Sequence, residues 1–130
     1  MKSIDLGKIA GLRVSAFPNA LIGFIGLWIV LSILAIVPPL LPPAHAIMGA
    51  LICTLLHFVS EFWHQLGHSW AAGRTGYPMN GVRFWWILGQ SMYPKDEPAL
   101  PGSIHIRRAL GGPIASFLLT LFSAVAFLAI

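Results

Sequence analysis

Three apolar stretches are long enough to cross a lipid bilayer, and they constrain the fold of this chain more than any other feature. A helix needs about 20 apolar residues to span a hydrocarbon core roughly 30 Å thick. The stretches 20–37 and 114–130 carry no charge, and the stretch 45–72 carries a single carboxylate, Glu61. We therefore expect an integral membrane protein with an all-α fold, whose transmembrane helices lie at about 20–37, 44–72 and 107–130.

The placement of charge predicts how the helices are oriented. Only 9% of the residues are charged and 57% are apolar, which excludes a disordered chain and is unusual for a soluble domain. The basic residues precede the first stretch or fall between the second and third: Lys2, Lys8, Arg13, Arg74, Arg83, Lys95, Arg107 and Arg108. By the positive-inside rule, the N-terminus and the loop 73–106 are cytoplasmic. Topology thus accounts for the net charge of +4, and we expect no nucleic-acid partner.

The segments between the helices give further expectations. Pro38 and Pro39 are expected to end the first helix, because proline cannot donate to a helical hydrogen bond. The segment 79–89 is aromatic and apolar but too short to span. It is either an interfacial or re-entrant extended segment, or an ordinary loop with an aromatic belt. We expect one membrane domain, residues 1–130, in the inner or plasma membrane of a prokaryote.

Four polar side chains form a stripe along the second predicted helix. With Glu61 set at zero and about 100° of rotation per residue, His57 lies near −40°, His64 near −60° and His68 near −20°. Ionisable groups inside a bilayer are costly and usually face a bundle interior or a wet cavity. Such a stripe is hard to explain by packing alone, although His57 by itself is readily interpreted as a hydrogen-bonded core residue.

The pair His64 and His68 has the spacing of a zinc-binding motif. Residues four apart lie one helical turn from each other, so two imidazoles can bind the same ion. In a zinc protease the residue after the first histidine is a glutamate that takes a proton from the zinc-bound water. Here that position is Gln65, which cannot act as a base. Glu61 is a candidate third ligand or a displaced base, and His57 is a further candidate ligand.

These motifs resemble the site-2 protease family of intramembrane zinc metalloproteases, peptidase family M50. The segment 64–72, HQLGHSWAA, is similar to the family consensus HELGHAxAA. The segment 108–116, RALGGPIAS, is similar to the family's Ala-Gly-Pro-Leu-x-Asn segment. The segment Gly11–Val14 resembles the family's entry segment, and the stretch from Gly76 to Gly89 resembles the membrane-associated hairpin that follows its metal motif. The likeness thus covers nearly the whole chain.

The resemblance implies a zinc ion held by the two histidines and by an aspartate on a later membrane helix. It also implies cleavage of substrate helices near the cytoplasmic face. This chain departs from the family in two respects, because Gln65 replaces the base and the later helix has no counterpart in these residues. We interpret it as a divergent member, either a fragment of a longer protein or a short homologue.

Three functional hypotheses follow. The first is a proteolytically inactive site-2-protease-like protein that keeps zinc at His64 and His68, with Glu61 or His57 completing the set. The second is a scaffold or accessory subunit of a larger membrane complex, for example an energy-converting assembly. The third is an active intramembrane metalloprotease with Glu61 as base. The expected partners are the lipid bilayer and the transmembrane helices of a substrate or a complex.

Overall fold

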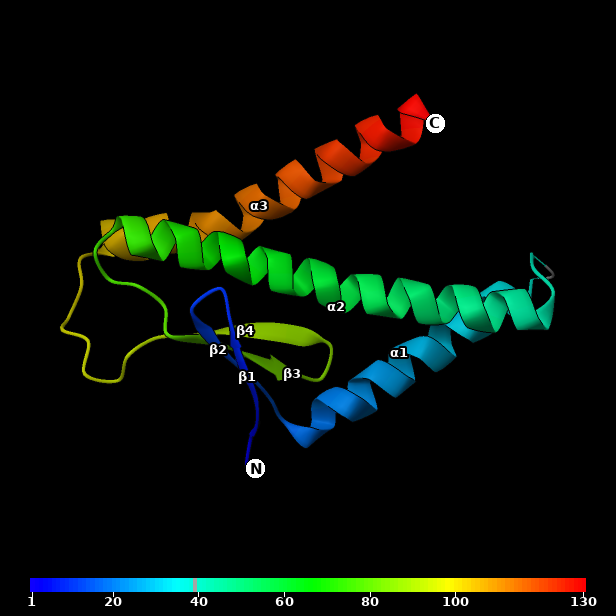
Figure 1. Ribbon diagram of the computed structural model, residues 1–130, viewed down its shortest axis with the longest axis horizontal. Helices are drawn as coiled ribbons and strands as arrows, with labels where there is room; N and C mark the ends of the chain where they lie inside the picture. The colour runs from blue at the N-terminus through cyan, green and yellow to red at the C-terminus, as the bar shows by residue number, and fades with distance from the viewer. Residues whose placement is uncertain (39) are drawn as a thin grey trace.

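The computed structural model describes residues 1–38 and 40–130, and this part of the chain forms three helices and four strands (Figure 1). In chain order they are β1 (Ile4–Ile9), β2 (Leu12–Ala16), α1 (Pro18–Ile36), α2 (Pro43–Arg74), β3 (Gly81–Trp85), β4 (Leu88–Met92) and α3 (Gly102–Ala129).

The three predicted transmembrane helices are present. Each is long and apolar enough to cross a membrane. α1 and α2 lie close to the expected bounds, whereas α3 begins at Gly102 and not at residue 107, directly after Pro101 in extended conformation. α1 ends at Ile36, just before the proline pair, and of that pair Pro39 lies outside the described residues. α2 ends at Arg74, two residues before Gly76, whose positive φ of 81° is typical of a helix C-terminus.

The expectation of an all-α fold was wrong, because the chain also forms a four-stranded sheet. The strand order is β1-β2-β3-β4. β1 and β2 are antiparallel, β2 and β3 are parallel, and β3 and β4 are antiparallel. The central parallel pairing joins segments that are separated in sequence by all of α1 and α2. Local periodicity carries no signal for such a distant pairing, and the strands are too short to show a clear alternation.

The aromatic segment 79–89, expected to be either an extended segment or an ordinary loop, lies in a β-hairpin, as the family resemblance implied. β3 and β4 pair from Gly81↔Met92 to Trp85↔Leu88, and the turn between them places Trp86 at a φ of 54°. That turn packs on α1, where Asn19 accepts a hydrogen bond from the backbone N–H of Trp86 at 3.3 Å. A Cβ at Gly23 of α1 would collide with the backbone of Trp86. The interfacial or re-entrant placement of this hairpin stays a prediction.

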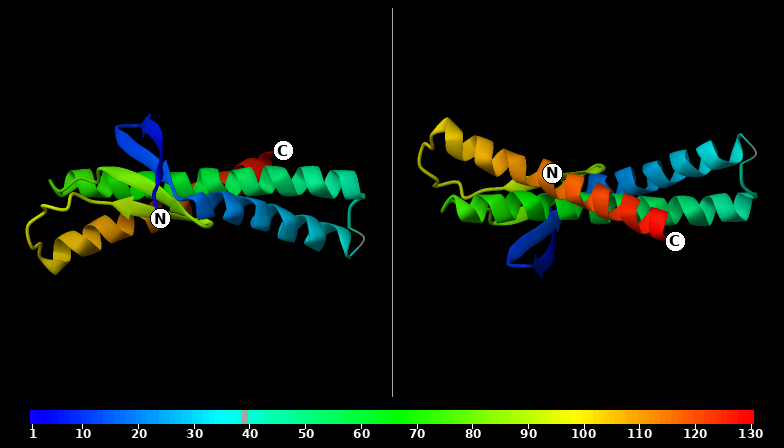
Figure 2. Two further views of the ribbon diagram at one scale, coloured as in Figure 1. Left: turned by 90° about the horizontal axis from the view of Figure 1, so that it is seen from below. Right: turned by 90° about the horizontal axis from the view of Figure 1, so that it is seen from above.

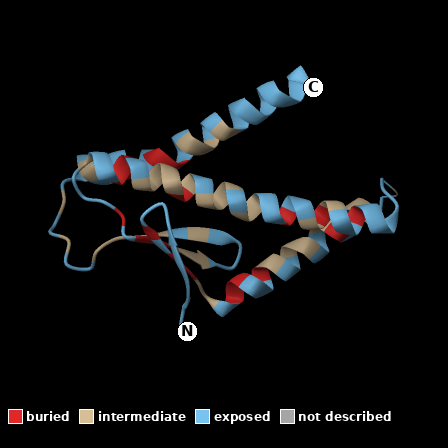
Figure 3. Ribbon diagram, in the orientation of Figure 1, coloured by how far each residue is buried: buried red, intermediate tan, exposed pale blue. Residues whose placement is uncertain are grey.

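The sheet packs beside the C-terminal half of α2 (Figures 1 and 2). A small core joins them, made of the buried residues Leu12, Ala72, Met79 and Val82, with Phe62, Leu66, Phe84 and Tyr93 packed against it. Most apolar side chains of the helices are instead exposed, as Figure 3 shows along α3. This distribution suits helices whose outer surfaces face lipid.

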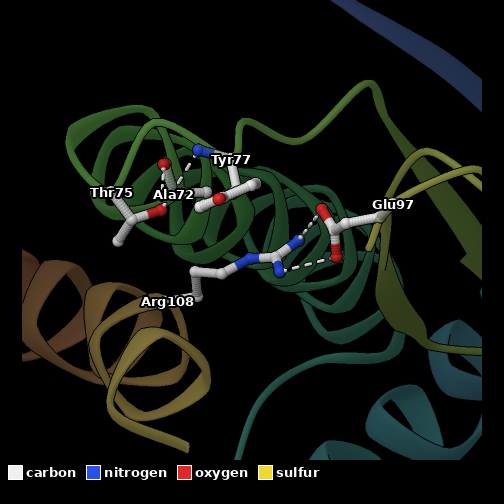
Figure 4. Close-up of polar contacts among 5 residues, drawn as sticks. All are labelled: Ala72, Thr75, Tyr77, Glu97 and Arg108. Carbon is white, nitrogen blue, oxygen red and sulfur yellow. Dashed lines mark hydrogen bonds and ion pairs between the residues drawn. The ribbon is translucent and has the colours of Figure 1, made fainter. Parts of the chain in front are cut away.

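α3 contacts α2 closely along its first half and then diverges from it (Figure 1). The closest approach is at Gly67 and Gly111, where a Cβ on either glycine would collide with the backbone of the other. The start of α3 is also tied to the preceding loop. The buried guanidinium of Arg108 donates two hydrogen bonds to the Glu97 carboxylate, at 2.9 and 3.1 Å (Figure 4). It also stacks on Tyr93.

Candidate metal centre

The polar stripe of α2 divides into two groups with different partners. His64 and His68 contact α3. His57 and Glu61, together with Gln65, contact the β3–β4 hairpin. The structure therefore brings His64 and His68 together at α3 and places His57 and Glu61 against the hairpin.

The imidazoles of His64 and His68 converge through their Nε2 atoms. These two nitrogens are 3.1 Å apart, and the rings meet edge to face. Each Nδ1 has an oxygen partner on α3, the Ser116 hydroxyl at 2.8 Å from His64 and the Arg108 carbonyl at 2.9 Å from His68. α3 thus orients both rings through their Nδ1 atoms, and the two Nε2 atoms face one another.

The partner of His68 fixes its tautomer. A backbone carbonyl only accepts hydrogen bonds, so the Nδ1 of His68 carries the proton, and in the neutral ring Nε2 then presents a lone pair. Ser116 can accept from His64 in the same way. When Ser116 accepts, two lone pairs face each other and a cation between them removes their repulsion; when Ser116 donates, the Nε2–H of His64 donates instead to Nε2 of His68 at 3.1 Å. Hydrogen bonds from Nδ1 to oxygen are the usual support for histidines that bind a metal.

The separation of the two nitrogens is also close to that of two ligands of one metal ion. Tetrahedral zinc with bonds of about 2.0–2.1 Å places two nitrogen ligands roughly 3.4 Å apart, close to the separation seen here. Gly112 of α3 lets both rings pack directly against the helix, because a Cβ at that position would overlap the Nε2 atoms of His64 and His68. The two histidines therefore match zinc in donor type and spacing.

Within residues 1–38 and 40–130, no three His, Cys, Asp or Glu side chains are close enough together to hold one metal. Glu61 accepts a hydrogen bond from the Gly89 N–H at 2.9 Å, and His57 lies 2.7 Å from the Ile87 carbonyl through Nε2. A role for either residue as a zinc ligand stays a prediction. Zinc is usually four-coordinate, so the pair supplies half of a site.

We name His57, Glu61 and Gln65 the hairpin clamp, because all three bind the backbone or a side chain of one hairpin edge. Gln65 is buried and uses both ends of its amide: Nε2 donates to the Gly89 carbonyl at 2.9 Å, and Oε1 accepts from the Ser91 hydroxyl at 2.6 Å. The clamp thus contacts the hairpin at Ile87, Gly89 and Ser91.

The three clamp residues reach the hairpin at regular intervals because the residue spacing along a helix matches that along a strand. Residues four apart on a helix rise about 6 Å, and residues two apart on a strand rise about 6.7 Å. Three consecutive turns of α2 therefore meet every second residue of the hairpin edge. β4 is an edge strand, so its outward N–H and C=O groups have no strand partner. The side chains of α2 supply these partners.

Several residues of the site could not be identified from motif spacing. Ser116 and the Arg108 carbonyl orient the histidines, and Gly112 makes space for them. Their signal was the segment 108–116, whose likeness to the family was noted without assigning a role to these residues. The likeness of the stretch up to Gly89 to the family's hairpin indicated the element, but nothing in the sequence indicated the contacts of Gly89 and Ser91 with α2.

Comparison with known proteins agrees with this fold. No model of a protein family and no curated protein sequence matches the chain. A solved structure does: the Site-2 Protease from Methanocaldococcus jannaschii, at 25% sequence identity and a TM-score of 0.67, over 99% of this chain and 53% of that one. The resemblance to the site-2 proteases is confirmed. This chain is thus a site-2-protease-like integral membrane protein, and it spans about half the length of that protease.

Proposed function

We propose that this site-2-protease-like protein binds zinc at His64 and His68 and does not hydrolyse peptide bonds by itself. The observation that carries the proposal is the convergent histidine pair, with both Nδ1 atoms engaged by α3 and both Nε2 atoms directed at one point. Further zinc ligands would come from water or from residues outside this constellation.

The chemistry of the site is incomplete without a base. Zinc, when bound, polarises a carbonyl and makes its bound water more acidic. A protease needs a group beside the metal that accepts the proton of that water, and an amide such as Gln65 cannot do so. Both ends of this amide are already bonded to β4. Loss of proton transfer typically lowers the rate by about a hundred- to ten-thousand-fold.

Metal analysis tests the first part. We expect the purified protein to retain close to one zinc per chain, and His64→Ala and His68→Ala each to lose most of it. His45→Ala is the matched control, because His45 is exposed at the start of α2, far from the pair. His57→Ala and Glu61→Gln show whether either residue completes the site. Negligible zinc in the parent protein, or equal zinc in all variants, contradicts the metal site.

A cleavage assay tests the second part. The zinc-loaded protein is incubated with a reporter transmembrane substrate, and His64→Ala sets the background. We expect no cleavage above that background. Cleavage by the parent protein that disappears in Glu61→Gln would instead establish an active protease with Glu61 as base.

A second candidate is a subunit that uses this fold for assembly. Residues 121–129 of α3 are all exposed and apolar or small, and so present a full helical surface to lipid or to other helices. A stable stoichiometric complex after purification in mild detergent would favour this candidate, and a monomer would argue against it.

A further inference from the structure

We propose that a groove between α2 and α3 is a binding site for one anionic phospholipid. The groove has a volume of about 600 Å³ and an almost wholly apolar lining, with two arginines among its residues. The residues that matter here are Trp63, Trp70 and Arg74 of α2 and Arg107, Ile114 and Leu118 of α3.

The groove is separate from the histidine pair. Trp70 is two residues beyond His68 on α2 and therefore points about 200° away from it around the helix axis. Gly67 and Gly111 also line the groove, and their close contact is the floor that divides it from the histidine side. A ligand in the groove would lie against the outer surface of the helix pair, where lipid is the neighbouring medium.

The two arginines lie at one end of the groove. α2 ends at Arg74, and Arg107 lies in the second turn of α3, which runs antiparallel to α2. Both side chains are exposed. The ion pairs in the described part of the chain are Arg13–Asp5 and Arg108–Glu97, so neither groove arginine is neutralised by a carboxylate there. The Arg74 guanidinium is held 5.2 Å from the centroid of the Trp70 ring.

The rest of the groove suits an acyl chain. From Arg74 back to Trp63 the groove follows α2 for about 16 Å, and from Arg107 to Leu118 it follows α3 for a similar length. The polar atom of Trp63 is directed away from the apolar space, because its Nε1–H donates to the Ala115 carbonyl at 2.8 Å. Apolar side chains therefore continue from the arginines towards the membrane interior.

Charge complementarity identifies the occupant. A transmembrane helix of a partner, or a second copy of this chain, matches the apolar part alone and leaves two arginines without a counter-charge. An anionic phospholipid matches both parts, since its phosphate meets the arginines while its acyl chain fills the groove. Basic pockets between transmembrane helices are known binding sites for such headgroups.

Native mass spectrometry of the detergent-solubilised protein tests the proposal, with phosphatidylglycerol and phosphatidylcholine as probes. We expect one phosphatidylglycerol to be retained per chain, with a preference of roughly 30-fold over phosphatidylcholine from two arginines. The preference should disappear in the double variant Arg74→Gln/Arg107→Gln and persist in Arg74→Lys/Arg107→Lys. Lys2→Gln/Lys95→Gln is the matched control, because it removes the same charge from exposed sites elsewhere.

Filling the groove is the complementary test. Ile114→Trp leaves both arginines in place, and we expect it to reduce phosphatidylglycerol retention at least tenfold while the zinc content is unchanged. Equal retention of the two lipids, or equal loss of preference in the control that lacks Lys2 and Lys95, would overturn the proposal. A lipid-free dimer that Ile114→Trp dissociates would also overturn it, because a second copy would then occupy the groove.

Discussion

Gln65 has a structural use that a glutamate at the same position could not reproduce. Its amide donates to the Gly89 carbonyl and accepts from the Ser91 hydroxyl. A carboxylate has acceptors only, so it would keep the bond from Ser91 and place a negative oxygen against the Gly89 carbonyl. The residue that removes the base from the motif is thus also the residue that ties β4 to α2.

We therefore expect Gln65→Glu to destabilise the hairpin. A buried carbonyl left without its donor costs about 1–3 kcal/mol in the free energy of unfolding. Hydrogen exchange of the β4 amides and the thermal midpoint in detergent measure the effect. Gln90→Glu is the matched control, since Gln90 is the exposed neighbour on the same strand. Equal behaviour of the two variants would show that the clamp contributes nothing measurable.

Gly112 gives a second test of a single position. A methyl group there would overlap both Nε2 atoms, so Gly112→Ala should separate the imidazoles and lower zinc affinity at least tenfold. Gly26→Ala in α1 is the control, because a Cβ at Gly26 meets open space in the described structure. Zinc titration of both variants provides the measurement. Unchanged affinity in Gly112→Ala would mean that the metal does not bind between these two nitrogens.

The contact between α2 and α3 depends on small residues at one crossing point. Gly67 and Gly111 let the two backbones touch, and this contact sets both the histidine geometry on one side and the groove on the other. Membrane helices associate chiefly through such close packing, because lipid provides little hydrophobic drive to bring them together. The position of α3 is therefore expected to be sensitive to a single methyl group.

Two glycines of α2 provide a matched comparison. Gly67→Ala should destabilise the protein by about 1–3 kcal/mol, because its Cβ collides with the backbone of Gly111. Gly49→Ala, in the same helix, meets open space and should stabilise it by roughly 0.5–1 kcal/mol. Thermal unfolding in detergent distinguishes them. A loss of stability in both variants, or in neither, would contradict the assignment of Gly67 to the helix contact.

The sequence predicted those elements whose signal is local. Length and hydropathy located α1, α2 and α3, and the one-turn spacing located His64 and His68. The sheet was missed because β2 pairs with β3 across two intervening helices. The division of the polar stripe was missed for the same reason: His57 and Glu61 share a helix face with the motif histidines, but their partners belong to a hairpin that no local pattern predicts.

The sheet also joins the segment before α1 to the segment after α2, which constrains the membrane topology. β2 precedes α1 and β3 follows α2, and the two strands pair directly. If both helices cross the bilayer, an even number of crossings returns the chain to the side on which it started, as this pairing requires. The sheet thus supports placing the N-terminus and the long loop on one side, in agreement with the positions of the basic residues.

Cysteine labelling tests this topology in a Cys53→Ser background. An impermeant maleimide should label Leu41→Cys in intact cells, because the turn between α1 and α2 is expected outside. Lys95→Cys should be labelled only after the membrane is permeabilised, since the positive-inside rule places its loop in the cytoplasm. Both positions are exposed. The opposite pattern would invert the topology, and labelling of both in intact cells would rule out an α2 that spans the membrane.

The parallel pairing of β2 with β3 has a consequence for biosynthesis. During translation the β1–β2 hairpin leaves the ribosome before α1, α2 and β3, so its partner strand is not yet made. Two membrane helices must be synthesised and inserted before β3 can complete the sheet. Until then, the N–H and C=O groups on the β3-facing edge of β2 have no strand partner. Pairings this distant in sequence form slowly. The N-terminal hairpin is therefore the segment of this protein most exposed to wrong pairing, and to capture by chaperones, while the nascent chain is still being inserted.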